Sequence, residues 1–237
     1  MIDHRAGMKT STASTQMRRG APVANGNVLP FPYDRTVGHG FASAKTGREI
    51  AGIAPLDVDL ACMLEAEPCI LTYDSVGNGL FEASVLGDPV LLAIVPTHGG
   101  ADEMAIRNVS DRTGLPILRV PERVLRTRPY VDNARLIARS GGYYPSAFAR
   151  IAILDALLAS GDRAPLGDLC ACADGVDDPI AAVLSLVPAG VLSIDMSKPI
   201  DANSEVVRIA NADIDPDAAD DERPATLLDV LAMPAVA

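Results

Sequence analysis

The chain has 237 residues, of which 49% are hydrophobic and 22% are charged, proportions that suit a folded globular protein and exclude an intrinsically disordered one. This length allows a full hydrophobic core and predicts two small domains. The formal net charge of −11 and the pI near 4.6 argue against a general polyanion-binding protein.

The sequence carries no recognisable signal peptide and no apolar run of transmembrane length, so we expect a cytoplasmic protein without a membrane partner. The spacings of its cysteines match no common zinc site, and we interpret all of them as small buried hydrophobic residues of a reducing compartment. They are Cys62, Cys69, Cys170 and Cys172.

In chain order, residues 1–40 are rich in Ser, Thr, Gly, Asn and Pro without periodicity, which predicts a disordered arm. Residues 41–142 are predicted to form an α/β domain. We expect helices over 56–68, 101–113 and 130–140, strands over 69–73 and 115–120, and a hairpin over 80–95 that turns at Gly87-Asp88-Pro89.

From residue 143 to 210 the predicted order is three helices and two strands, which is the order of a winged helix-turn-helix domain. The first helix, over 145–159, is predicted to be amphipathic, with its apolar stripe formed by Phe148, Ile151, Leu154, Leu157 and Leu158. The third, over 178–187, has no Lys, Arg, Asn or Gln to contact DNA, so we expect it to bind protein. Residues 211–237 are predicted to be an acidic disordered tail.

Two stretches carry a resemblance to a known family. LDVDLACMLEAEPCILTYDS, from Leu56, has a helix with a Leu-Glu-x-acidic-Pro ending and a strand ending in Tyr. GLPILRVPERVLRTRPYVDNARLIARSGGYY, from Gly114, has a strand, a turn and an Asn-Ala-Arg-Leu helix. Together they resemble the TnsA-type endonuclease subunit of heteromeric transposases, over most of residues 50–210. The resemblance implies a restriction-endonuclease-like mixed-sheet domain followed by a winged helix.

In nucleases of this fold, carboxylates from a helix and two strands hold Mg²⁺, and a nearby lysine assists the reaction. By resemblance, Asp57 takes the position of the helix glutamate and Glu82 that of the strand aspartate. Ala93 and Val95 take the positions of the acidic-x-Lys step. A site without the lysine and with at most two carboxylates should bind Mg²⁺ weakly, so we expect a degenerate site, no cofactor and no hydrolysis.

Simpler interpretations of these residues stay open. Asp57 lies in the first turn of its helix, where a carboxylate is favourable without a metal, and so do Asp102 and Glu103 in theirs. Glu82 fits the solvent-facing position of an alternating strand. His98, beside Gly99-Gly100, is an alternative catalytic candidate, although no paired nucleophile accompanies it.

Six arginines within 21 residues suggest a nucleic-acid contact: Arg119, Arg123, Arg126, Arg128, Arg135 and Arg139. Internal salt bridging is an equally open interpretation. We therefore expect a non-catalytic TnsA-like subunit that bridges proteins, such as a transposase or another DNA-processing subunit, and that contacts DNA. The alternatives are an active Mg²⁺-dependent endonuclease subunit, and a regulator that uses the same folds.

Overall fold

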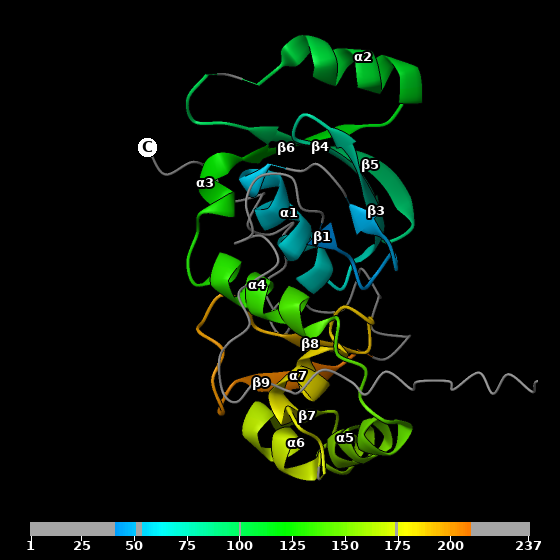
Figure 1. Ribbon diagram of the computed structural model, residues 1–237, viewed down its shortest axis with the longest axis vertical. Helices are drawn as coiled ribbons and strands as arrows, with labels where there is room; N and C mark the ends of the chain where they lie inside the picture. The colour runs from blue at the N-terminus through cyan, green and yellow to red at the C-terminus, as the bar shows by residue number, and fades with distance from the viewer. Residues whose placement is uncertain (1–40, 51–53, 100, 174, 210–237) are drawn as a thin grey trace, which may run out of the picture. The chain divides into compact units, whose positions relative to one another are not determined.

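A computed structural model describes residues 41–50, 54–99, 101–173 and 175–209 (Figure 1). The predicted N-terminal arm, residues 1–40, and the predicted acidic tail, residues 211–237, lie outside the described residues.

The first part of the fold is a mixed four-stranded sheet in the order β3-β4-β5-β6. β3 (Ile70–Gly77), β4 (Leu80–Val85) and β5 (Asp88–Val95) are antiparallel, and β6 (Ile117–Pro121) is parallel to β5. Both hairpin turns use residues with positive φ, Asn78-Gly79 and Leu86-Gly87. This geometry matches the twist of the flanking strands, which is why Asn-Gly is common in two-residue hairpins.

Helices α1 (Pro55–Ala66) and α2 (Glu103–Thr113) lie on opposite sides of this sheet (Figure 1). Every residue of α1 from Asp57 to Ala66 is buried, because the sheet covers one side of the helix and α4 (Tyr130–Ser140) covers another. α2 fully buries Ile106, half-buries Ala105, Val109 and Ser110, and exposes its other residues. The inner core therefore lies on the α1 side.

Contacts between α1 and α4 also explain part of the Asn-Ala-Arg-Leu motif. Ala134 is fully buried between these helices, which lets them approach closely. Arg135 donates from Nε and Nη2 to Oδ1 of Asp59 on α1, at 2.9 and 2.6 Å. The short α3 (Glu122–Leu125) connects β6 to α4, and β1 (Phe41–Ala42) pairs with β2 (Glu49–Ile50).

The second part contains three helices and a small antiparallel sheet. The helices are α5 (Ala147–Ala159), α6 (Leu166–Cys172) and α7 (Pro179–Leu184), and the strands are β7 (Arg163–Pro165), β8 (Leu192–Ile194) and β9 (Glu205–Arg208). The strand order is β7-β9-β8. Asp178 caps α7, since its side chain accepts from the Ala181 amide at 2.9 Å.

The two parts share one hydrophobic core in the described chain. This core runs from Phe41 through α1, the sheet and α4 to α7 and β9. Asn133 of α4 adds polar contacts: its amide donates to the carbonyl oxygens of Met196 and Lys198, at 3.0 and 2.6 Å, and accepts from the Ile200 amide at 3.3 Å. The loop between β8 and β9 is thus fixed to α4.

The predicted α/β class is confirmed, with a mixed four-stranded sheet and flanking helices. Strand β7 was not predicted, because the expected order of residues 143–210 has only two strands, both after the three helices. The apolar stripe predicted on the 145–159 helix differs from the buried face of α5, which consists of Ala149, Ile153 and Leu157. No helix in the described ranges has the length and apolarity needed to cross a membrane.

Candidate functional site

The β4–β5 hairpin presents two faces, and each packs on a different helix. Leu80, Leu91 and Ala93 form a small cluster with Ile106 of α2. Phe81, Ala83, Leu92 and Ile94 belong to the main core with α1. Because successive residues of a strand alternate between faces, Glu82 and Val95 fall on the α2 side.

Asp57 lies on the opposite side of the sheet, at the start of α1. Its Oδ2 accepts a hydrogen bond from the Ala54 amide at 3.1 Å, which caps the helix. Its Oδ1 faces the β4–β5 hairpin: a Cβ added to Gly79 would lie 3.8 Å from Oδ1 and 3.4 Å from Cβ of Ile94. Burial raises the pKa of Asp57 above its ordinary value, while the Ala54 hydrogen bond lowers it.

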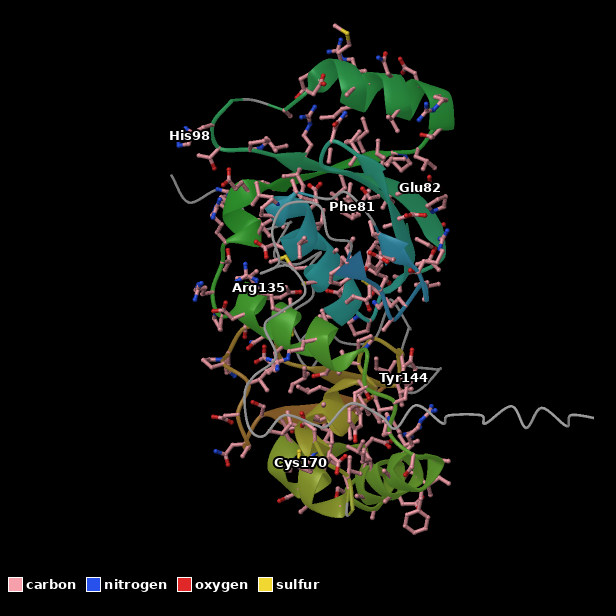
Figure 2. The ribbon with its side chains drawn as sticks, in the orientation of Figure 1. Phe81, Glu82, His98, Arg135, Tyr144 and Cys170 are labelled. Atoms are coloured by element: carbon pink, nitrogen blue, oxygen red, sulfur yellow. The ribbon has the colours of Figure 1, made fainter. Side chains whose placement is uncertain are left out.

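Glu82 is exposed near the middle of β4, opposite Asp74 of β3 and Leu91 of β5. It lines a shallow hollow of about 290 Å³ with Thr72, Ser84 and Arg48, and Arg48 pairs with Asp74 at 3.3 Å. Figure 2 shows Glu82 at the surface and Phe81 in the interior. The structure therefore does not bring Asp57 and Glu82 together.

The positions assigned to the acidic-x-Lys step are aliphatic and enclosed. Ala93 is fully buried in the α2-side cluster, and Val95 is partly buried at the end of β5. On the α1 side the corresponding neighbours are Leu92 and Ile94, both buried. A lysine ammonium at position 92, 93 or 94 would lose its hydration, with no carboxylate pair provided by the hairpin.

The remaining sequence candidates are Asp102, Glu103 and His98. The two acids have hydrogen-bond partners within the chain, and His98 is exposed. Asp102 caps α2 by accepting from the Ala105 amide at 3.0 Å, and Glu103 accepts two hydrogen bonds from Arg119. His98 is exposed and projects from the loop between β5 and α2 (Figure 2). No nucleophile contact to His98 is present among the described residues. Within the described ranges, three His, Cys, Asp or Glu side chains do not gather there as a metal ion would require.

Most of the predicted arginine surface is paired within the chain. Four of the arginines form ion pairs: Arg119 with Glu103 at 2.7 Å, Arg126 with Glu122 at 2.6 Å, Arg128 with Asp132 at 3.0 Å, and Arg135 with Asp59 at 2.6 Å. Arg123 and Arg139 are exposed and form no ion pair with any described residue. Internal salt bridging thus accounts for four of the six side chains.

A buried polar cluster around Lys45 was not anticipated from the sequence. The Lys45 ammonium donates to the carbonyl oxygens of Leu64 at 2.7 Å, Ile70 at 2.8 Å and Glu67, at the junction of α1 and β3. The buried Glu65 accepts from the Tyr73 hydroxyl at 2.8 Å. Burial lowers the pKa of Lys45 to about 8, against the opposing influence of Glu65 and Glu67.

This cluster is a structural element rather than an open site, because its charged groups are enclosed and hydrogen-bonded. The lysine connects the β1–β2 turn to the carboxyl end of α1. The last carbonyl groups of a helix have no partner within the helix, and they favour a cation there. Lys45 is separated by about 20 positions from Glu65, and no local sequence pattern connects them.

The cysteines differ in exposure, contrary to the expectation that all are buried. Cys62 is buried, Cys69 and Cys170 are partly buried, and Cys172 is exposed. Burial raises the pKa values of the Cys62, Cys69 and Cys170 thiols, which makes these thiols poor nucleophiles.

The predicted third helix of residues 143–210, expected to bind another protein, packs largely within the described chain. α7 packs against α4, α5 and α6, and Ala182, Val183 and Leu184 are buried.

No protein-family model matches the chain, and a search of curated proteins gives no match either.

Proposed function

We propose that this chain is a non-catalytic, TnsA-like protein that acts by binding other proteins, with DNA as a secondary contact. The observation that carries the proposal is that apolar side chains of the β4–β5 hairpin pack on both faces of the sheet, in the α1 core on one face and with Ile106 of α2 on the other. Asp57 and Glu82 lie on opposite faces of the sheet, so they are not two ligands of one Mg²⁺ ion. The resemblance at residues 50–210 supplies the family expectation.

We also propose that the fold consists of a restriction-endonuclease-like domain followed by a winged helix. The first domain is supported by the order helix, strand, hairpin, helix, parallel strand. The winged helix is supported by the order α5-β7-α6-α7-β8-β9 with the three-stranded sheet. In this description α7 is the helix that reads DNA in other winged helices, and here it packs on α4.

The DNA contact rests on Arg123 and Arg139, the two exposed arginines of the basic stretch without an ion pair in the described chain. Two such residues neutralise few phosphates, and the net charge of −11 opposes a polyanion. We therefore propose that DNA binding is weak and that protein partners, such as a transposase or another DNA-processing subunit, provide most of the affinity.

Incubation of the full chain with supercoiled plasmid and Mg²⁺ or Mn²⁺ tests the proposal. We expect no nicking above the level of a denatured control. Nicking by the wild type that Asp57→Ala abolishes would instead establish the active endonuclease. Glu82→Ala serves as the matched control, because its carboxylate lies on the other face of the sheet and should not influence a site at Asp57.

A further inference from the structure

Helix α5 has two apolar faces, and the described residues bury only one of them. Ala149, Ile153 and Leu157 face the core. The other face leaves three large apolar residues in solvent: Phe148 is 82% exposed, Ile151 57% and Leu158 55%. Tyr144, just before the helix, is 87% exposed, and Figure 2 shows it on the segment that leads into α5. Such a concentration of exposed apolar side chains on one helix indicates an interaction surface.

The exposed face has the spacing of a helix–helix seam. Ile151 and Leu158 are seven residues apart, as are Ala147 and Leu154, which is half-buried between the two faces. These pairs correspond to the a and d positions of a heptad, the residues that pack into the gaps of a facing helix. An amphipathic helix therefore fits this face better than a sheet or an extended peptide.

The charges that border this seam are complementary to the same charges on a second copy of the helix. Arg150 and Asp155 flank the a and d positions on opposite sides, at heptad positions g and e. Both are exposed, and neither forms an ion pair with another described residue. In two parallel helices, a g residue lies beside the e residue five positions later on the other helix. Two copies of α5 would thus form the Arg150–Asp155 pair twice.

We propose that a second copy of this chain binds here, with the two α5 helices side by side and parallel about a two-fold axis. A two-fold axis places the same patch on both chains, so a surface must be complementary to itself. The apolar seam and the oppositely charged flanks of α5 meet that condition. This inference is independent of the proposed function, since it uses neither the hairpin nor the arginine stretch.

The test is the oligomeric state of the full chain by analytical ultracentrifugation, with Arg150→Asp and Asp155→Arg as charge-reversal variants. We expect a concentration-dependent dimer for the wild type. Each single variant places like charges opposite each other twice, which should raise the dimer dissociation constant roughly tenfold or more. An equimolar mixture of the two variants should restore wild-type affinity, because every pair is again of opposite sign.

Circular dichroism of each variant controls for folding, and Ile151→Glu should abolish the dimer. A wild type that remains monomeric at all soluble concentrations would overturn the proposal. Increased protease sensitivity of residues 210–237 in the Ile151→Glu monomer would then identify the chain's own C-terminal segment as the occupant. A dimer unaffected by the variants, or a mixture that fails to recover, would also reject pairing through α5.

Discussion

At the scale of single residues, Asp57 has the contacts of a helix cap, whereas the sequence also allowed the role of a metal ligand. Its carboxylate is buried beside Gly79 and Ile94 and accepts from the Ala54 amide. Burial raises its pKa, so the folded state binds a proton more readily than the unfolded state does. By linkage, the charged carboxylate opposes folding at neutral pH, and its contribution to stability increases as the pH falls through the folded pKa.

Asp57→Asn keeps an oxygen acceptor and removes the buried charge. We expect its free energy of unfolding at pH 7 to equal that of the wild type or exceed it by up to about 1 kcal/mol, with the difference shrinking toward pH 4. Urea denaturation across this pH range measures the effect. Asp102→Asn is the matched control, an exposed cap at which Asn and Asp are equivalent. Thermal stabilisation by Mg²⁺ in the wild type but not in Asp57→Asn would contradict a purely capping role.

Lys45 illustrates the opposite case, a partly buried charge that its surroundings require. Lys45→Met would leave three carbonyl acceptors and the buried Glu65 and Glu67 without the ammonium. Removing one partner of a buried charged cluster typically costs about 3–5 kcal/mol, and we expect a loss of that order in urea denaturation. Lys198→Met is the control: its exposed pair with Asp195 should contribute at most about 1 kcal/mol. A loss below about 1 kcal/mol for Lys45→Met would show that the cluster is dispensable.

At the scale of elements, Asn133 makes α4 the support of the β8–β9 loop. Asn133→Ala would leave the Met196 carbonyl group without its donor in a buried setting, and the Lys198 carbonyl group without its donor in a partly buried one. Each unsatisfied buried group costs about 1–3 kcal/mol, so we expect a loss of about 2–4 kcal/mol in the free energy of unfolding. Asn203→Ala, exposed in the same loop, should change it by less than about 0.5 kcal/mol. Equal effects of the two changes would remove the special role of Asn133.

The elements themselves were largely predictable where periodicity was strong. The predicted helix over 130–140 matches α4, and those over 56–68, 101–113 and 145–159 match α1, α2 and α5 within two residues at each end. The extent of β3 was underestimated, although Asn78-Gly79 is a recognised hairpin signal that indicates two adjoining strands. β7 could not be predicted from three residues, because the strand that pairs with it, β9, lies about 40 positions away.

Side-chain direction was less predictable than secondary structure. The apolar residues of α5 lie on several sides of the helix, so periodicity could not decide which face the core would cover. The hairpin shows the same limit: Asp57 and Glu82 were both assigned to a remnant site, yet strand alternation and the position of α1 place them on opposite faces. The Arg135–Asp59 pair joins helices 76 residues apart in sequence, a distance at which no local pattern operates.

At the scale of the whole molecule, α7 joins the two parts of the described chain through one core. Leu184 is fully buried there, and α7 packs on α4 as well as on α5 and α6. Leu184→Ala should lower the free energy of unfolding by about 2–5 kcal/mol. Because the core is continuous, we expect this loss to affect the sheet as much as the C-terminal helices.

Two optical probes can separate these regions in a single denaturation experiment. The chain has no tryptophan, and the buried Tyr73 and Tyr130 report on the sheet and α4 in near-ultraviolet circular dichroism. Far-ultraviolet circular dichroism reports on all helices. In Leu184→Ala both signals should shift together to a lower denaturant midpoint. Ile180 is exposed in the same helix, and Ile180→Ala should change the free energy of unfolding obtained from either signal by less than about 0.5 kcal/mol. A tyrosine transition that keeps its wild-type midpoint while the helical signal moves would mean that the two parts unfold independently.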